Sequence, residues 1–261
     1  MNSRWQAYLV VALVCFRALL SYGQSRPSAA LTPAQQMELK TLTEQLSDPA
    51  RSSRTKLDAA KLLLMRPRAE ATEILGGFLS DPSNRAAQIA VAEAIGAVGG
   101  GREEFIEPLM QMLTGDEASV RAPAGRALAT FKDHGVIDRL VSIATDPKRS
   151  RAVRLVTISS MQHVLDKRAV DALVRLLDDK DQDVSVAAAD ALAALTNIGA
   201  FRTDKALAKR WWARNKHKDR SQWLADLADS LVRSRASLKV ANSRLRERLA
   251  KAMTDLYNTT G

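Results

Sequence analysis

The chain has 261 residues and a formal net charge of +10; 46% of its residues are hydrophobic and only 5% are aromatic. Ala, Leu and Val supply most of that apolar content, a mixture that suits helices better than strands. The one cysteine, Cys15, excludes a disulfide within the chain and a metal site built from several thiolates.

The first 23 residues have the pattern of a secretory signal peptide. Arg4 precedes an apolar run over residues 7–16, and a small-x-small sequence at 21–23 forms a cleavage site. We therefore expect an exported protein of the periplasm or cell envelope, with residues 24–32 left as a linker and no thiol in the mature chain. An uncleaved anchor and a wrongly assigned start codon are the alternatives, although the apolar run is short for a membrane span.

From residue 33 onward, one helix–turn–helix pattern recurs. Thr32 is the expected N-cap of the first helix, with Pro33 at its first position. The clearest copy covers residues 169–195. Its first helix carries the apolar stripe Val170, Leu173, Val174 and Leu177, an acidic turn follows, and its second carries the stripe Val184, Ala188, Ala191, Leu192 and Leu195. Two such helices cannot bury both stripes alone, so the pattern needs neighbouring copies.

Five copies are present. Their turns are marked by Asp48-Pro49, Asp81-Pro82, Gly115-Asp116, Asp146-Pro147 and Asp179, at spacings of 33, 35, 30 and 33 residues. The second helices are expected over residues 57–65, 86–98, 120–131, 153–165 and 184–195. Helix pairs at this near-constant period predict an all-α fold, a right-handed α-solenoid over residues 33–198.

The repeated pattern is L-x-x-L-L, an Asp turn, V-R or V-x, then A-x-x-A-L-x-x-L. It resembles HEAT repeats, in particular the short, Ala-rich type described as lyase-like. Val120-Arg121 with Ala127-Leu128, and Val184 with Ala191-Leu192, carry the resemblance best. A tetratricopeptide array has a similar period, but its Trp, Gly, Tyr and Pro positions are missing here, and an armadillo array would need a longer period. The resemblance implies a fold and leaves the activity open.

Residues 199–224 differ from the repeats in composition, because they are basic and rich in tryptophan. Gly199 is the expected C-cap of the last repeat helix. Trp211, Trp212 and Trp223 are expected to cover the apolar end of the solenoid, with a ligand-stacking or partner-contact site as the alternative. The Trp-Trp, basic loop, Trp arrangement resembles a terminal element of exported bacterial HEAT-repeat proteins of the planctomycete type.

A long final helix is expected from its N-cap, Ser221, to about Tyr257, and residues 225–261 form a C-terminal segment of basic amphipathic character. The leucines of this helix lie seven apart at Leu224, Leu231, Leu238 and Leu245. Ser234 and Arg248 interrupt the second row that a strong coiled coil would need. The helix could fold back on the array, associate with a second copy or bind a partner.

The positive charge is concentrated in this C-terminal region. Residues 201–261 contain 15 Lys or Arg against 6 Asp or Glu, whereas residues 24–200 contain 22 against 23. Such a tail would attract an anionic surface, unless it is simply a solvated basic helix face. The candidate polyanion contacts are Arg210, Arg214, Lys216, Lys218 and Arg220. Export argues against nucleic acid as the target.

Catalytic and metal-binding patterns are missing. None of the three histidines has a partner residue at helical spacing for a metal. The acidic turn at 178–183 lacks the glycine and glutamate of a calcium loop, so its carboxylates are expected to cap the next helix. We therefore expect no enzyme activity and no cofactor.

The function expected from the sequence is a non-catalytic scaffold that binds another protein on the concave face of the repeats. One alternative is binding of a polyanion or nucleic acid through the basic, Trp-containing segment. Another is a lyase-like or enzyme-accessory role, because related repeats occur in chromophore lyases.

Overall fold

The computed structural model describes residues 31–66, 68–99 and 101–260. The predicted signal peptide and all but the last two residues of the predicted linker lie outside these ranges. All elements within them are helices and none is a strand, so the predicted α-solenoid is confirmed. No helix in this part of the chain is long and apolar enough to cross a membrane.

Five helix pairs form the array, as predicted. They are α2 (Pro33–Ser47) with α3 (Ser53–Leu64), α4 (Ala69–Ser80) with α5 (Arg85–Val98), α6 (Ile106–Thr114) with α7 (Ala118–Leu128), α8 (His134–Thr145) with α9 (Arg151–Met161), and α10 (Lys167–Leu176) with α11 (Gln182–Thr196). A short 3-10 turn, η1 (Glu103–Phe105), leads into α6. Beyond the array lie η2 (Gly199–Arg202), α12 (Lys205–Asn215) and α13 (Arg220–Thr260).

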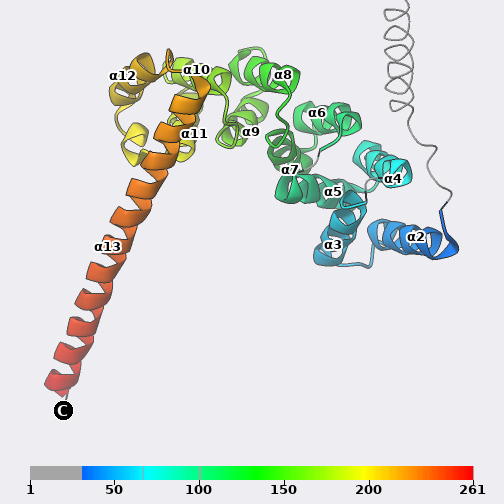
Figure 1. Ribbon diagram of the computed structural model, residues 1–261, viewed down its shortest axis with the longest axis horizontal. Coiled ribbons are helices and arrows are strands. Elements are labelled where there is room, and N and C mark those ends of the chain that lie inside the picture. The colour runs from blue at the N-terminus through cyan, green and yellow to red at the C-terminus, as the bar shows by residue number, and fades with distance from the viewer. Residues whose placement is uncertain (1–30, 67, 100, 261) are drawn as a thin grey trace, which may run out of the picture.

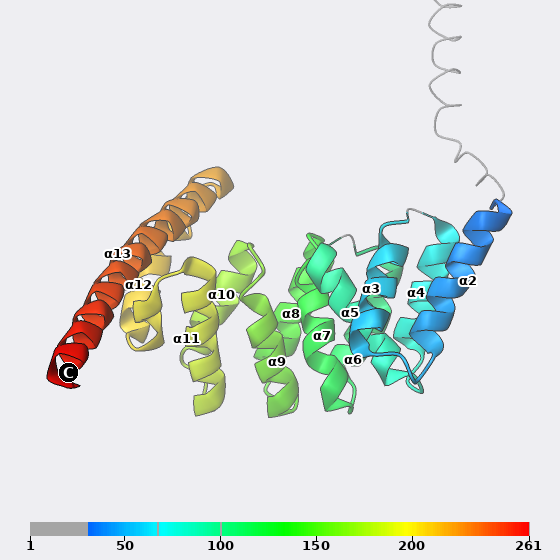
Figure 2. The same ribbon diagram turned by 90° about the horizontal axis from the view of Figure 1, so that it is seen from below.

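The array is curved, with the second helix of every pair on its inner side and the first helix on its outer side (Figure 1). Neighbouring second helices pack on one another along the whole array, whereas first helices of neighbouring pairs make fewer contacts. Both views place α13 at the opposite end from α2 (Figure 2). The inner face is therefore built by α3, α5, α7, α9 and α11.

Side-chain caps fix where the helices begin. Thr32 and Gln35 form a capping box, in which Thr32 Oγ1 accepts from the Gln35 amide at 3.3 Å and Gln35 Oε1 accepts from the Thr32 amide at 3.0 Å. In the acidic turn, Asp181 caps α11 by accepting from the Asp183 amide at 3.0 Å. The capping role predicted for the carboxylates of this turn is thus confirmed for Asp181 only. Asp178, Asp179 and Asp183 accept instead from Lys209, Arg154 and Arg151.

Each pair also contains a polar side chain, buried in four pairs and half-buried at Arg121, that hydrogen-bonds the end of its first helix. These side chains are Lys56, Gln88, Arg121, Arg154 and Ser185, and each donates to a carbonyl at the end of the preceding helix or in the turn. Carbonyls at a helix C-terminus have no intrahelical partner, so these bonds satisfy groups that would otherwise be buried unpaired. Burial lowers the pKa of Lys56, an effect that nearby Asp48 opposes.

The fifth pair differs because its side chain, Ser185, is short. Lys205, from α12, reaches in and donates to Ser185 Oγ at 2.6 Å. Two further contacts join α12 to the same pair: Lys209 bonds Asp178 at 2.6 Å, and Trp212 Nε1 donates to Asp171 at 2.9 Å. The cap is therefore attached to the last pair by polar contacts as well as by apolar packing.

Two boundary predictions are wrong. The C-cap of α11 is Asn197, in the left-handed region at φ 57° and ψ 30°, and Gly199 begins η2. Asn tolerates this conformation, so it takes the place that glycine usually holds. Helix α13 begins at Arg220 and not after Ser221, because Asp219 is the cap: its Oδ1 accepts from the Gln222 amide at 2.8 Å.

The closest helix approach described for a glycine lies between α7 and α9, at Gly125. A Cβ there would lie 2.1 Å from Ser160 Oγ and 3.2 Å from Ser160 Cβ. We expect Gly125→Ala to lower the free energy of unfolding by about 1–3 kcal/mol through overpacking. In a Ser160→Ala background the loss should shrink or reverse, since Ala favours the helix by about 1 kcal/mol over Gly.

Urea unfolding of the four proteins in this cycle measures the coupling between the two positions. Gly96→Ala is the matched control, because a Cβ at Gly96 would make only ordinary contacts, the nearest at 3.5 Å from the Ala127 nitrogen. The control should be neutral or stabilising. Equal losses at the two glycines would contradict the packing explanation.

Candidate functional site

The inner face carries two rows of side chains that repeat from pair to pair. Directly after the polar residue of each second helix that donates to the preceding turn comes an apolar one: Leu57, Ile89, Ala122, Leu155 and Val186. Four residues further on lies a mostly charged row: Lys61, Glu93, Arg126, Ser159 and Asp190. The members of both rows are half-buried or exposed. The inner face therefore offers an interrupted apolar row beside an alternating polar one.

Ion pairs between successive repeats neutralise much of the charge of the array. They are Arg85–Glu117, Arg126–Glu93, Arg139–Glu107, Arg151 with Asp181 and Asp183, and Arg168–Asp138, and Arg66–Glu38 adds one within the first pair. Most of these side chains are exposed, so each pair contributes only about 0–1 kcal/mol to stability. Their periodic placement agrees with the near-zero net charge of the array.

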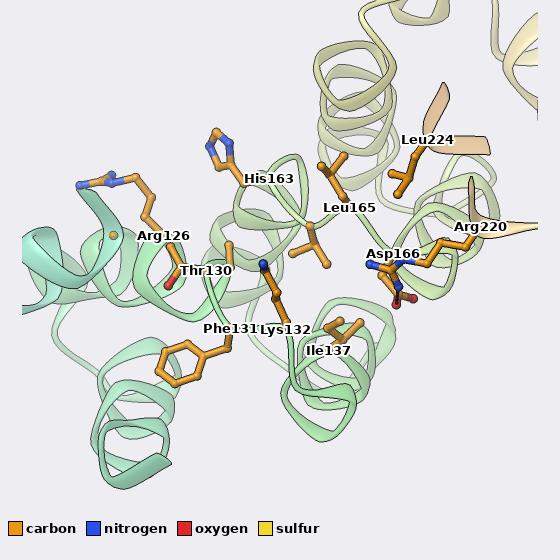
Figure 3. A pocket seen from close by; sticks show the side chains of 13 residues that line it. Arg126, Thr130, Phe131, Lys132, Ile137, His163, Leu165, Asp166, Arg220 and Leu224 are labelled. Atoms are coloured by element: carbon orange, nitrogen blue, oxygen red, sulfur yellow. Dashed lines mark ion pairs between the residues drawn. The ribbon is translucent and has the colours of Figure 1, made fainter. Parts of the chain in front are cut away.

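A groove of about 590 Å³ opens at the C-terminal ends of α5, α7 and α9 (Figure 3). The first turns of α13 form one side of it, through Arg220 and Leu224. Its floor is apolar and includes Ala129, Ile137, Val164 and Leu165, of which Leu165 is 52% exposed. Figure 3 shows Arg126, Lys132, His163 and Arg220 around this apolar floor. The groove thus combines an apolar floor with a basic rim.

Asp166 is the one carboxylate that lines the groove. Its burial raises its pKa, but hydrogen bonds from Arg168 outweigh this effect and hold the pKa below its usual range. Arg168 donates to it through its amide at 2.8 Å and its Nε at 3.1 Å, and Arg220 lies 3.9 Å away. Asp166 is therefore ionised and already neutralised, so the charge that the rim presents to solvent is positive.

The three predicted tryptophans occupy two different places. Trp211 and Trp212 in α12 stack on each other with ring centroids 6.1 Å apart, and Phe201 lies 5.6 Å from Trp211. Trp223 is fully buried where α13 begins, next to Lys167 and Arg168 at the start of α10. Trp212 is also buried, and Trp211 is half-buried. All three pack as part of the cap; Phe201 is a member that the sequence analysis did not single out.

The five predicted polyanion contacts are also dispersed. Arg210 lies 3.9 Å from Asp204, and Lys218 pairs with Asp226 at 2.6 Å. Arg214 and Lys216 are exposed on α12 and just after it. Only Arg220 lines the groove. Among the described residues, no group of three or more His, Cys, Asp or Glu side chains is placed to hold a metal ion.

Stacked helix pairs with a capped end and a continuous inner face define an α-solenoid repeat protein. The family model described as HEAT repeats matches residues 39–129 and 106–193, which is more than half of the chain. The chain therefore belongs to the HEAT-repeat family. No curated protein matches it.

Two solved structures are similar to this chain. One is an engineered protein, target OR329 of the Northeast Structural Genomics Consortium, with 20% identity over 76% of this chain and 97% of that one, at a TM-score of 0.37. The other is human deoxyhypusine hydroxylase in complex with glycerol, with 17% identity over 62% of this chain and 76% of that one, at a TM-score of 0.34.

Proposed function

We propose that this protein is a non-catalytic scaffold that binds another protein along the inner face of its helix pairs. The observation that carries the proposal is the groove, which continues the inner face. Arg126 belongs both to the charged row of that face and to the rim of the groove. HEAT repeats are generally protein-interaction scaffolds, and solenoids of this kind use their extended concave surfaces for binding.

The chemistry of the groove favours a partner segment with an apolar side chain flanked by carboxylates. Leu165 is half exposed on the floor, so covering the rest of it would contribute about half of the 1.5–3 kcal/mol that full burial of a leucine is worth. Lys132 and Arg220 on the rim would attract acidic neighbours of that side chain and speed the encounter at low salt. The small residues of the inner face, such as Ala122, would let an extended partner lie close to the helices.

We further propose that the scaffold works outside the cytoplasm, in the periplasm or cell envelope, as exported bacterial relatives of the planctomycete type would. The support is the signal-peptide pattern of residues 1–23. Mass spectrometry of the N-terminus of protein from the native host tests it. A mature N-terminus at Gln24 is expected, and an intact Met1 in a cytoplasmic fraction would contradict export.

Co-purification from the envelope fraction of the native host tests the binding proposal. We expect Leu165→Glu and Lys132→Glu each to reduce recovery of the specific partner about tenfold or more, because the first places a charge on the apolar floor and the second reverses the rim.

The controls match these changes on other surfaces. Met37→Glu alters a 64% exposed side chain of α2, and Lys148→Glu alters an exposed lysine in the turn before α9. Both should retain the partner. Equal recovery by groove and control variants, or no protein above background with the unaltered chain, would refute the proposal.

A further inference from the structure

Helix α13 has an anchored part and a projecting part. At its start, Trp223 and Leu227 are buried, Leu224 is half-buried, and Ser230 Oγ donates to the Thr196 carbonyl at 3.1 Å. From residue 231 to 254 every side chain except the half-buried Ser234 is exposed. We call residues 231–254 the projecting segment. It is about 36 Å long at 1.5 Å per residue, and Figure 1 shows it extending beyond the array.

The projecting segment carries a continuous apolar stripe that no described residue covers. Its members are Leu231, Leu238, Leu245, Leu249 and Met253, which are 50%, 60%, 61%, 63% and 64% exposed. A row of large apolar side chains of this extent marks an interaction site. Two steps of seven residues are followed by two steps of four, so the stripe follows the 3.6-residue period of a straight helix. A left-handed coiled coil requires a strict 3.5-residue period instead.

The charge of the projecting segment opposes pairing with a second copy. It contains seven Lys or Arg and a single acidic residue, Glu247. Within the described residues, no ion pair joins any of these seven cations to a carboxylate of the array. A dimer through the stripe would bring two such helices side by side and would have few carboxylates to offset the repulsion. The charge therefore favours an anionic occupant.

The distribution of the cations favours a surface over a single partner helix. On a helix with 100° per residue, Arg235, Lys239 and Arg246 lie beside the stripe, whereas Arg233, Arg244 and Lys251 lie on the far side. The far side is about one helix diameter, roughly 10 Å, from anything that the stripe touches. That distance equals about one Debye length, so a charged plane in contact with the stripe would attract these cations too. A single partner helix packed on the stripe would leave them out of contact.

We infer that the projecting segment of α13 binds an anionic lipid surface. The helix lies flat, with its leucine stripe at the boundary between headgroups and acyl chains, while the cations beside the stripe extend toward the headgroups. The array would then be held at the membrane by its C-terminal end, leaving the inner face accessible. This inference is independent of the proposed partner and of the groove.

Vesicle co-sedimentation of the full chain tests the inference. The vesicles contain either phosphatidylcholine alone or equal parts of phosphatidylcholine and phosphatidylglycerol. We expect binding to the anionic vesicles to be at least about tenfold tighter and to weaken as salt is raised, because each basic residue near such a surface adds to the attraction.

Three variants separate the stripe from the charge. Leu238→Gln with Leu245→Gln should weaken binding about tenfold or more, since both leucines leave the lipid boundary. Val232→Gln with Val240→Gln is the matched control, because these exposed valines lie off the stripe and the net charge is unchanged. The control should change binding by at most about twofold. Circular dichroism checks that all variants keep the helix.

The charge variant changes the far side of the helix, with Arg233, Arg244 and Lys251 all replaced by Gln. It should weaken binding to anionic vesicles about fivefold, because at one Debye length each cation keeps only about a third of its attraction, and it should leave binding to neutral vesicles unchanged. Leu165→Glu should bind vesicles like the unaltered chain, so failure of the scaffold proposal would not be mistaken for failure of this one.

Several results would overturn the inference. Equal binding to both vesicle types, or equal weakening by the leucine and valine variants, would show that the stripe and charge do not act together on lipid. A dimer in sedimentation equilibrium that the leucine variant abolishes, without vesicle binding, would assign the stripe to a second copy. An acidic protein retained through the stripe, again without vesicle binding, would assign it to a protein partner.

Discussion

Replacing Trp223 with alanine should lower the free energy of unfolding by about 3–5 kcal/mol. Trp223 is fully buried where α13 meets the start of α10, so truncation would leave a large cavity at that contact. We expect α13 to detach at its first turns and the turn at 216–219 to become sensitive to proteases. Urea unfolding and limited proteolysis measure the two effects.

Phenylalanine substitutions provide the control for this prediction. Among the described residues, the indole nitrogen of Trp223 has no hydrogen-bond partner, so Trp223→Phe loses none of the bonds described and should cost well under half as much as the alanine variant. Trp212 differs, because its indole nitrogen donates to Asp171 at 2.9 Å. Trp212→Phe should therefore lose about 0.5–1.5 kcal/mol for that bond in addition to the change in packing. Similar losses for Trp223→Phe and Trp223→Ala would contradict the cavity argument.

Arg154→Ala should have the second large effect, a loss of about 2–4 kcal/mol. Arg154 is 5% exposed, donates to the Ala144 carbonyl at 3.0 Å and pairs with Asp179. Truncation leaves that carbonyl and a largely buried carboxylate without their donor. Breaking a fully buried pair costs about 3–5 kcal/mol, and the 18% exposure of the Asp179 side chain reduces the figure.

An arginine three residues earlier is the matched control. Arg151 pairs with Asp181 and Asp183, but its side chain is 61% exposed, so Arg151→Ala should cost at most about 1 kcal/mol. Urea unfolding of both variants at pH 7 makes the comparison. A loss from Arg154→Ala no larger than that from Arg151→Ala would show that burial does not strengthen the pair.

The pH dependence of the Arg154 effect follows from Asp179. The hydrogen bond from Arg154 lowers the pKa of Asp179, burial opposing it, whereas an aspartate in the unfolded chain titrates at about 3.9. A depressed folded-state pKa stabilises the fold at pH values above the unfolded value and ceases to do so as the pH falls through the folded value. The difference in free energy of unfolding between the unaltered chain and Arg154→Ala should therefore be largest at pH 7. It should shrink as the pH falls below about 4.

The solenoid could be predicted from the sequence because the same pattern recurs five times. Each pair carries the same apolar spacing and the same turn, so an ambiguity in one copy is resolved by the others. The helix ends at Asn197 and Asp219 had no such support. Gly199 and Ser221 are good capping residues two positions away, and only the path of the chain into η2 and α13 decides between the candidates.

The candidate site was less accessible to sequence reasoning. The groove joins residues of the repeats, such as Lys132 and Leu165, to Leu224, which lies beyond the cap helix α12. No spacing rule connects these segments, since their proximity depends on where α13 crosses the array. The division of α13 into anchored and projecting parts also depends on tertiary packing, because the seven-residue leucine spacing runs without a break from Leu224 in the anchored part to Leu245 in the projecting part.

The contact between Lys205 and Ser185 bears on how the number of helix pairs in such an array can change during evolution. In the other four pairs the long donor belongs to the pair itself, so none of them needs the cap to complete the end of its first helix. The fifth pair has a short serine that α12 completes, together with Asp178 and Asp171, which bind Lys209 and Trp212. Descendants of this chain should thus gain and lose pairs in the interior and inherit the fifth pair and its cap as one unit.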